Sequence, residues 1–93
     1  MDTLERARMD IDRIDREMAA LFETRMDTAR EIAAYKRRVG MEIFDPGREK
    51  AVLEKGVKRL ENPEYSEYYK EFIKAVMDIS KKYQNDLIKG ERI

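Results

Sequence analysis

The sequence predicts an all-α protein: one domain over residues 1–93, with one long, one short and one medium helix. Two observations predict this class. Gly and Pro divide the chain into three segments whose apolar residues recur at helical spacing. The composition, with 42% hydrophobic and 43% charged residues but only four glycines and two prolines, suits helices better than a sheet.

The first helix is expected to run from Leu4 to Val39, a stretch without Gly or Pro. Steps of seven from Leu4 and from Ala7 trace two adjacent rows that form an apolar seam. Basic residues at 36–38 followed by Gly40 are typical of a helix end. The two rows contain Leu4, Ile11, Met18, Arg25, Ile32 and Val39, and Ala7, Ile14, Leu21, Thr28 and Tyr35.

Two shorter helices are expected to follow. Asp45 suits an N-cap and Pro46 the first helical position, so a helix should run from about Pro46 to about Leu60, with Gly56 a weak point inside it. Asn62 and Pro63 break the chain before a third helix over about 64–88. Its expected inner side comprises Tyr65, Tyr69, Phe72, Ile73, Val76, Tyr83 and Leu87.

The length of the first helix predicts an assembly. About 36 residues at 1.5 Å each extend roughly 54 Å, whereas a compact small domain is nearer 30 Å across. The two remaining helices cannot cover the whole seam, so we expect a second copy to cover it in an intertwined helical-bundle homodimer. An extended coiled-coil rod is the alternative, but the second and third helices favour a closed bundle.

The charge balance and the missing residue types exclude several classes of function. Lys plus Arg equals Asp plus Glu, which disfavours nucleic acid or an anionic membrane as a partner. The chain has no Cys and no His, which removes thiolate nucleophiles, the usual zinc sites and imidazole acid–base chemistry. With neither a signal-like start nor an apolar span, we expect a cytoplasmic protein.

Polar residues interrupt the apolar rows. Arg25 lies on the seam, and Lys36 emerges about three turns later from nearly the same face. Ser80 and Gln84 occupy core-facing places one turn apart in the third helix. Arg48 is unusual in another way, because it stands in the first turn of a helix, where acidic residues are favoured. Together they predict a pocket for a small polyanion.

Each residue also has an ordinary structural explanation. A cation could pair with an acidic neighbour, and Lys36 could simply complement the helix end. Ser80 and Gln84 could form a satisfied polar contact that fixes the register of the helices. The acidic neighbours in question are Glu23 and Asp27 for Arg25, and Asp45 and Asp2 for Arg48.

In the order and spacing of these residues, the chain resembles the all-helical class of chorismate mutases over nearly its full length. Each short motif is weak alone, but the ordered combination is specific. The resemblance rests on Arg8 and Asp15 of "RMDIDRID", Arg25 of "LFETR", Lys36 of "AAYK", "DPGRE" from Asp45 to Glu49, and "SKKYQ" from Ser80 to Gln84.

The resemblance implies rearrangement of chorismate to prephenate in phenylalanine and tyrosine biosynthesis, without metal or cofactor. Arg25 would bind a substrate carboxylate from its own chain, and Arg8 would reach the site of the partner chain. Arg8 and Arg25 lie roughly 100° apart around the helix, which agrees with separate sites. Lys36 and Gln84 would hydrogen-bond the ether oxygen of the substrate.

The remaining residues would complete the substrate site. Ser80 and Arg48 would line its carboxylate end, and Asp45 and Glu49 would hold the substrate hydroxyl. Lys81 adds a charge at the rim, where some relatives are apolar. The open alternatives are an isochorismate pyruvate lyase of the same fold and a non-catalytic helical dimerisation or regulatory module.

Overall fold

The computed structural model describes residues 2–93, which form three α-helices, one 3₁₀ turn and no strand. The helices α1, α2 and α3 are Thr3–Val39, Pro46–Arg59 and Ser66–Lys89, and the 3₁₀ turn η1 is Pro63–Tyr65. The predicted all-α class, with one long, one short and one medium helix, is confirmed. No helix within this described part is long and apolar enough to cross a membrane.

The helix ends follow the expected capping chemistry. The Asp2 carboxylate accepts a hydrogen bond from the Glu5 amide at 2.7 Å at the start of α1. Gly40 ends α1 at φ 77°, a left-handed conformation that glycine adopts without strain. Asp45 caps α2, with Pro46 directly after it. These local signals set where the chain turns.

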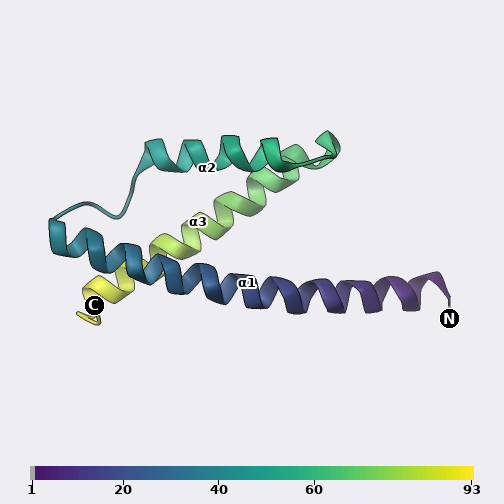
Figure 1. The fold of residues 1–93 in the computed structure, drawn as a ribbon, viewed down its shortest axis with the longest axis horizontal. Helices are drawn as coiled ribbons and strands as arrows, with labels where there is room; N and C mark the ends of the chain where they lie inside the picture. Colours follow the sequence, from purple (N-terminus) through teal and green to yellow (C-terminus); the bar gives the residue numbers. More distant parts are fainter. Residues whose placement is uncertain (1) are drawn as a thin grey trace.

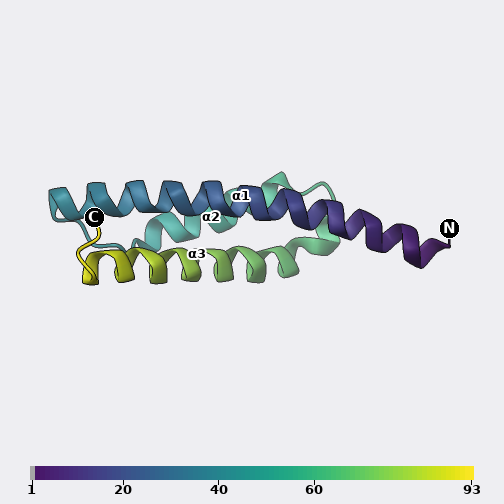
Figure 2. The ribbon, with the colours of Figure 1, turned by 90° about the horizontal axis from the view of Figure 1, so that it is seen from below.

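The three helices form an elongated, open arrangement of 55 × 27 × 14 Å (Figure 1). α3 packs along the C-terminal half of α1, and α2 packs against α3. The N-terminal end of α1 projects beyond the other helices in both views (Figures 1 and 2), and the following turns up to Arg25 run beside the N-terminal half of α3, with which they line an apolar groove. We call residues 3–25 of α1 the arm.

The core of the single chain is small and lies where α1 meets α3. Its buried apolar residues are Ala29 and Ala33 of α1 with Met77 and Leu87 of α3. The small alanine side chains let α3 approach closely. Every residue of the arm is exposed, including the apolar residues of the predicted seam. The arm therefore buries no residue within one chain.

Two local expectations need correction, and one glycine has a contact that the sequence did not predict. Tyr65 belongs to η1, because Pro63 and the Asn62 cap form a 3₁₀ turn before α3 begins at Ser66. Tyr65 and Phe72 are both exposed in the single chain instead of lying on an inner face. Gly56 is a close contact point, since a Cβ there would lie 2.8 Å from Cε2 of the Tyr69 ring.

Candidate active site

A cavity of about 290 Å³ opens between the C-terminal half of α1, the start of α2 and the middle of α3. Its volume is near the lower end of the range for small-molecule sites, roughly 300–1,000 Å³. All but one of the predicted site residues line it. They are Arg25, Lys36, Asp45, Arg48, Glu49, Ser80 and Gln84.

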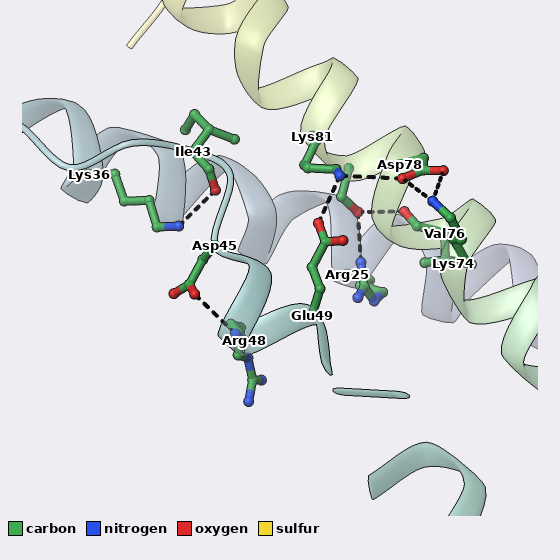
Figure 3. Close-up of polar contacts among 11 residues, drawn as sticks. Arg25, Lys36, Ile43, Asp45, Arg48, Glu49, Lys74, Val76, Asp78 and Lys81 are labelled. Atoms are coloured by element: carbon green, nitrogen blue, oxygen red, sulfur yellow. Dashed lines mark hydrogen bonds and ion pairs between the residues drawn. The ribbon is translucent and has the colours of Figure 1, made fainter. Parts of the chain in front are cut away.

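Ser80 links the guanidinium of Arg25 to the α3 backbone. An Arg25 nitrogen donates to Ser80 Oγ at 2.7 Å, and that hydroxyl donates to the Val76 carbonyl at 3.0 Å (Figure 3). The single hydroxyl hydrogen of Ser80 is thus committed, while four N–H groups of Arg25 stay available for a ligand. The alternative explanation for Arg25, a pairing with Glu23 or Asp27, does not hold within residues 2–93, where neither forms an ion pair with it.

Gln84 is buried and has a fixed amide. Its Nε2 donates to the Ala29 carbonyl of α1 at 2.9 Å. An amide nitrogen carries two hydrogens, so one N–H remains for an acceptor oxygen in the cavity. The contact also joins α3 to α1, as a satisfied polar contact in a core would.

Lys36 also lines the cavity, one turn before α1 ends. Its ammonium donates to the Ile43 carbonyl in the α1–α2 connection at 3.0 Å (Figure 3). Two of its three N–H groups are therefore left for a ligand. Lys36 also sits in the last turn of α1, where a cation complements the helix end.

The start of α2 forms the mouth of the cavity. Asp45 accepts a hydrogen bond from the Arg48 amide at 3.0 Å through one carboxylate oxygen. The donor in this bond is the main-chain N–H of Arg48, so the guanidinium of Arg48 takes no part in capping the helix. It lines the cavity at the positive end of a helix, where backbone N–H groups already favour an anion.

Lys81 connects two helices at the rim. Its ammonium lies 2.8 Å from Glu49 Oε2 on α2 and 3.4 Å from Asp78 Oδ1 on α3 (Figure 3). It also lies 4.6 Å from the centre of the Phe44 ring. The neighbouring Glu49 carboxylate raises the pKa of Lys81 above its usual value of 10.5. The sequence placed Lys81 at the rim, but the pairing depends on how α2 packs against α3.

Three cations of the cavity have no carboxylate partner. Within residues 2–93, Arg25, Lys36 and Arg48 form no ion pair, although other lysines and arginines in this part of the chain do. The cavity also holds neutral donors and an apolar floor that includes Ile32, Val52 and Met77. This combination suits an organic dianion with a hydrophobic body.

The comparison with protein families gives a match to chorismate mutase type II over residues 7–85. The chain belongs to the chorismate mutase type II family. The searches of curated proteins and of solved structures returned no match. Membership in the chorismate mutase family supports an isomerase that acts on chorismate, and the matched range spans Arg8 to Gln84.

Arg8 is the predicted site residue that the single chain leaves outside the cavity. It lies on the exposed arm, seventeen residues before Arg25, which is about 26 Å along the helix at 1.5 Å per residue. In a chorismate mutase fold built from one such chain, Arg8 cannot reach the cavity that Arg25 lines. The cavity also has an open side, because Arg25 itself is exposed.

Proposed function

We propose that the protein converts chorismate to prephenate by a Claisen rearrangement. In this reaction the ether C–O bond breaks while a C–C bond forms within the same molecule, so no proton, metal or co-reactant enters the balance. The enzyme must hold the flexible dianion in its reactive shape and stabilise negative charge on the ether oxygen. We place this activity in the cytoplasm, in phenylalanine and tyrosine biosynthesis.

The observation that carries this proposal is the set of three cations without carboxylate partners around one small cavity. Unpaired cations held close together repel one another, so a bound dianion lowers the energy of the arrangement. A module that only dimerises would not need Arg25, Lys36 and Arg48 to line one cavity. The family match supports chorismate as the anion.

The proposed roles follow from the donors that remain available. Arg25 binds one carboxylate in its own chain, and Ser80 acts by holding Arg25. Arg48 supports the carboxylate end at the start of α2. Lys36 and the second amide hydrogen of Gln84 donate to the ether oxygen, where charge accumulates in the transition state.

Two acidic residues of the cavity serve the substrate hydroxyl in this proposal. Asp45 lies where the chain enters α2, and its carboxylate is engaged by the cap, which favours its backbone as the contact. Glu49 lies one turn later with one carboxylate oxygen on Lys81. The other oxygen can accept a hydrogen bond from the hydroxyl.

We further propose that the active form is an intertwined homodimer in which Arg8 of each chain enters the cavity of the other. The arm carries a row of exposed apolar side chains, and an apolar groove between α1 and α3 faces outward beside Arg25. A second copy would cover both. The large apolar residues exposed on the arm are Leu4, Met9, Ile11, Ile14, Met18, Leu21 and Phe22.

The proposal is tested by incubating the purified protein with chorismate and identifying the product. We expect prephenate to form far faster than in buffer. Isochorismate is assayed in parallel, because release of pyruvate and salicylate would identify the lyase instead. Chorismate that rearranges only at its uncatalysed rate would contradict the proposal and favour a non-catalytic module.

A further inference from the structure

We propose that Lys81 is a positioning residue that holds the Glu49 carboxylate against the substrate hydroxyl. The inference rests on the function proposed above and adds a residue to its site. Lys81 acts through Glu49 and does not itself touch the substrate.

Two carboxylates and one aromatic ring surround the ammonium of Lys81. An ammonium has three N–H groups. The ammonium nitrogen lies 2.8 Å from a Glu49 carboxylate oxygen and 3.4 Å from one of Asp78 (Figure 3). It also lies 4.6 Å from the centre of the Phe44 ring. Cations are attracted to an aromatic face at this distance. The ammonium is therefore already engaged by three groups of the protein itself.

The contacts of Lys81 come from three segments of the chain. Glu49 is on α2, Asp78 is on α3, and Phe44 is in the connection before α2. Asp78 is itself held by Lys74, whose ammonium lies 3.1 Å from the other carboxylate oxygen. The ammonium of Lys81 is thereby anchored to α3, and it in turn fixes the first turn of α2.

A charge argument explains why Glu49 needs this partner. A free carboxylate would repel a dianionic ligand in a partly enclosed cavity, where charge interactions are stronger than in bulk water. The Glu49 and Lys81 side chains are 21% and 26% exposed, so water screens the pair only in part. Lys81 offsets the charge of Glu49 and leaves Oε1 as a hydrogen-bond acceptor.

The test compares four variants with the wild type in chorismate turnover: Lys81→Met, Lys81→Arg, Asp78→Asn and the matched control Lys82→Met. Lys82 is the next residue on α3, but it is 79% exposed and pairs with Asp86 within the same helix. We expect Lys81→Met to lower kcat/KM about tenfold and Asp78→Asn about threefold. Lys81→Arg keeps a cation beside Glu49 and the Phe44 ring, so it should stay within about twofold of the wild type. Lys82→Met should do so as well, because Lys82 lies outside the cavity.

A double-mutant cycle with Glu49→Gln separates positioning from a merely structural role. If Lys81 acts through Glu49, adding Lys81→Met to Glu49→Gln should change kcat/KM by less than about twofold. A chorismate analogue without the ring hydroxyl should likewise react at similar rates with the wild type and with Lys81→Met. Thermal unfolding of each variant establishes that it is folded at the assay temperature.

The outcomes are distinct. Additive effects in the cycle, or unchanged turnover by folded Lys81→Met, overturn this inference while leaving the proposed function intact. If Lys81→Met does not fold, Asp78→Asn decides, because it weakens the anchor and leaves Lys81 in place. Turnover by Asp78→Asn at the wild-type rate would then overturn the inference. A wild type that does not convert chorismate contradicts the proposed function, and this inference with it.

Discussion

The two halves of α1 belong to one continuous helix but have opposite surroundings. The C-terminal half packs against α3 through Ala29 and Ala33 and lines the cavity. The arm, residues 3–25, has no buried residue, and its N-terminal end projects beyond the other helices (Figure 1). Apart from Arg25 at its end, which bonds Ser80 and lines the cavity, the arm therefore leaves its apolar side chains exposed in the single chain.

The difference lies in the residues that each half offers to a neighbour. The covered half meets α3 with small side chains, which allow close approach and leave room for polar groups such as Gln84. The arm instead presents large apolar side chains such as Ile11 and Met18. Burying each of these is worth about 1.5–3 kcal/mol. We interpret the arm as a surface for a second copy, and Arg8 as its contribution to catalysis.

The largest expected effect comes from removing a cation of the cavity. Arg25→Ala or Lys36→Ala should lower kcat by about 10²–10⁴-fold, because each removes a charge-assisted contact to the dianionic substrate. Steady-state rates on chorismate measure this effect. The control is Lys70→Ala on α3, which removes an exposed cation that pairs with Glu67 outside the cavity. Turnover near the wild-type rate in either cavity variant would contradict its assigned role.

A smaller effect tests how tightly the covered region is packed. Gly56→Ala should lower the free energy of unfolding by about 1–2 kcal/mol, because the added methyl group must displace the Tyr69 ring. Helix propensity alone predicts the opposite sign, a gain of about 1 kcal/mol. Denaturant unfolding at one fixed protein concentration distinguishes the two, since an oligomer's stability depends on concentration.

The matched control for Gly56 is Gly47→Ala in the same helix. A Cβ at Gly47 would meet only Asp45 Oδ1, at an ordinary 3.6 Å. We expect Gly47→Ala to leave the stability unchanged or slightly raised. A stabilised Gly56→Ala variant would mean that α2 and α3 approach each other less closely than the structure has them.

The smallest expected effect is that of pH. Glu49 raises the pKa of Lys81 above 10.5, so the stability from this pair is present below that value and lost as pH rises through the raised pKa. Lys74 lowers the pKa of Asp78 below 3.8, so its contribution is present above 3.8 and lost as pH falls through the lowered pKa. Both pairs are intact at neutral pH.

Gln84 does not titrate, so the proposed mechanism has no acid requirement. We expect kcat/KM to vary by less than about threefold from about pH 6 to pH 9. The pH profile of the Gln84→Ala variant, compared with that of the wild type, checks the assignment. A wild-type rate that rises steeply toward low pH would mean that a protonated acid contacts the ether oxygen.

The helix layout was predictable because strong local signals divide the chain. Gly40, Asp45 with Pro46, and Asn62 with Pro63 act on the backbone nearest to them, so they can be read without tertiary structure. The start of α3 was misplaced by two residues, because a 3₁₀ turn and an α-helix share the same early signals.

The candidate site was predictable as a set of residues but not as a set of contacts. Polar interruptions in apolar rows gave Arg25, Ser80 and Gln84, whereas the bond between Arg25 and Ser80 joins residues 55 apart in sequence. The pairing of Glu49 with Lys81 and the contact of Gly56 with Tyr69 likewise depend on how α2 and α3 fit together. Sequence periodicity carries no information on that fit.

The most direct test of the proposed pairing between arm and cavity is a mixing experiment. Arg8→Ala and Arg25→Ala chains, each inactive alone, are combined and allowed to exchange. Each mixed dimer would keep one intact cavity, so an equal mixture should recover about a quarter of wild-type activity, since half of the dimers are mixed and half of their sites are whole. No recovery, with mixed dimers demonstrated by mass, would contradict a site shared between chains.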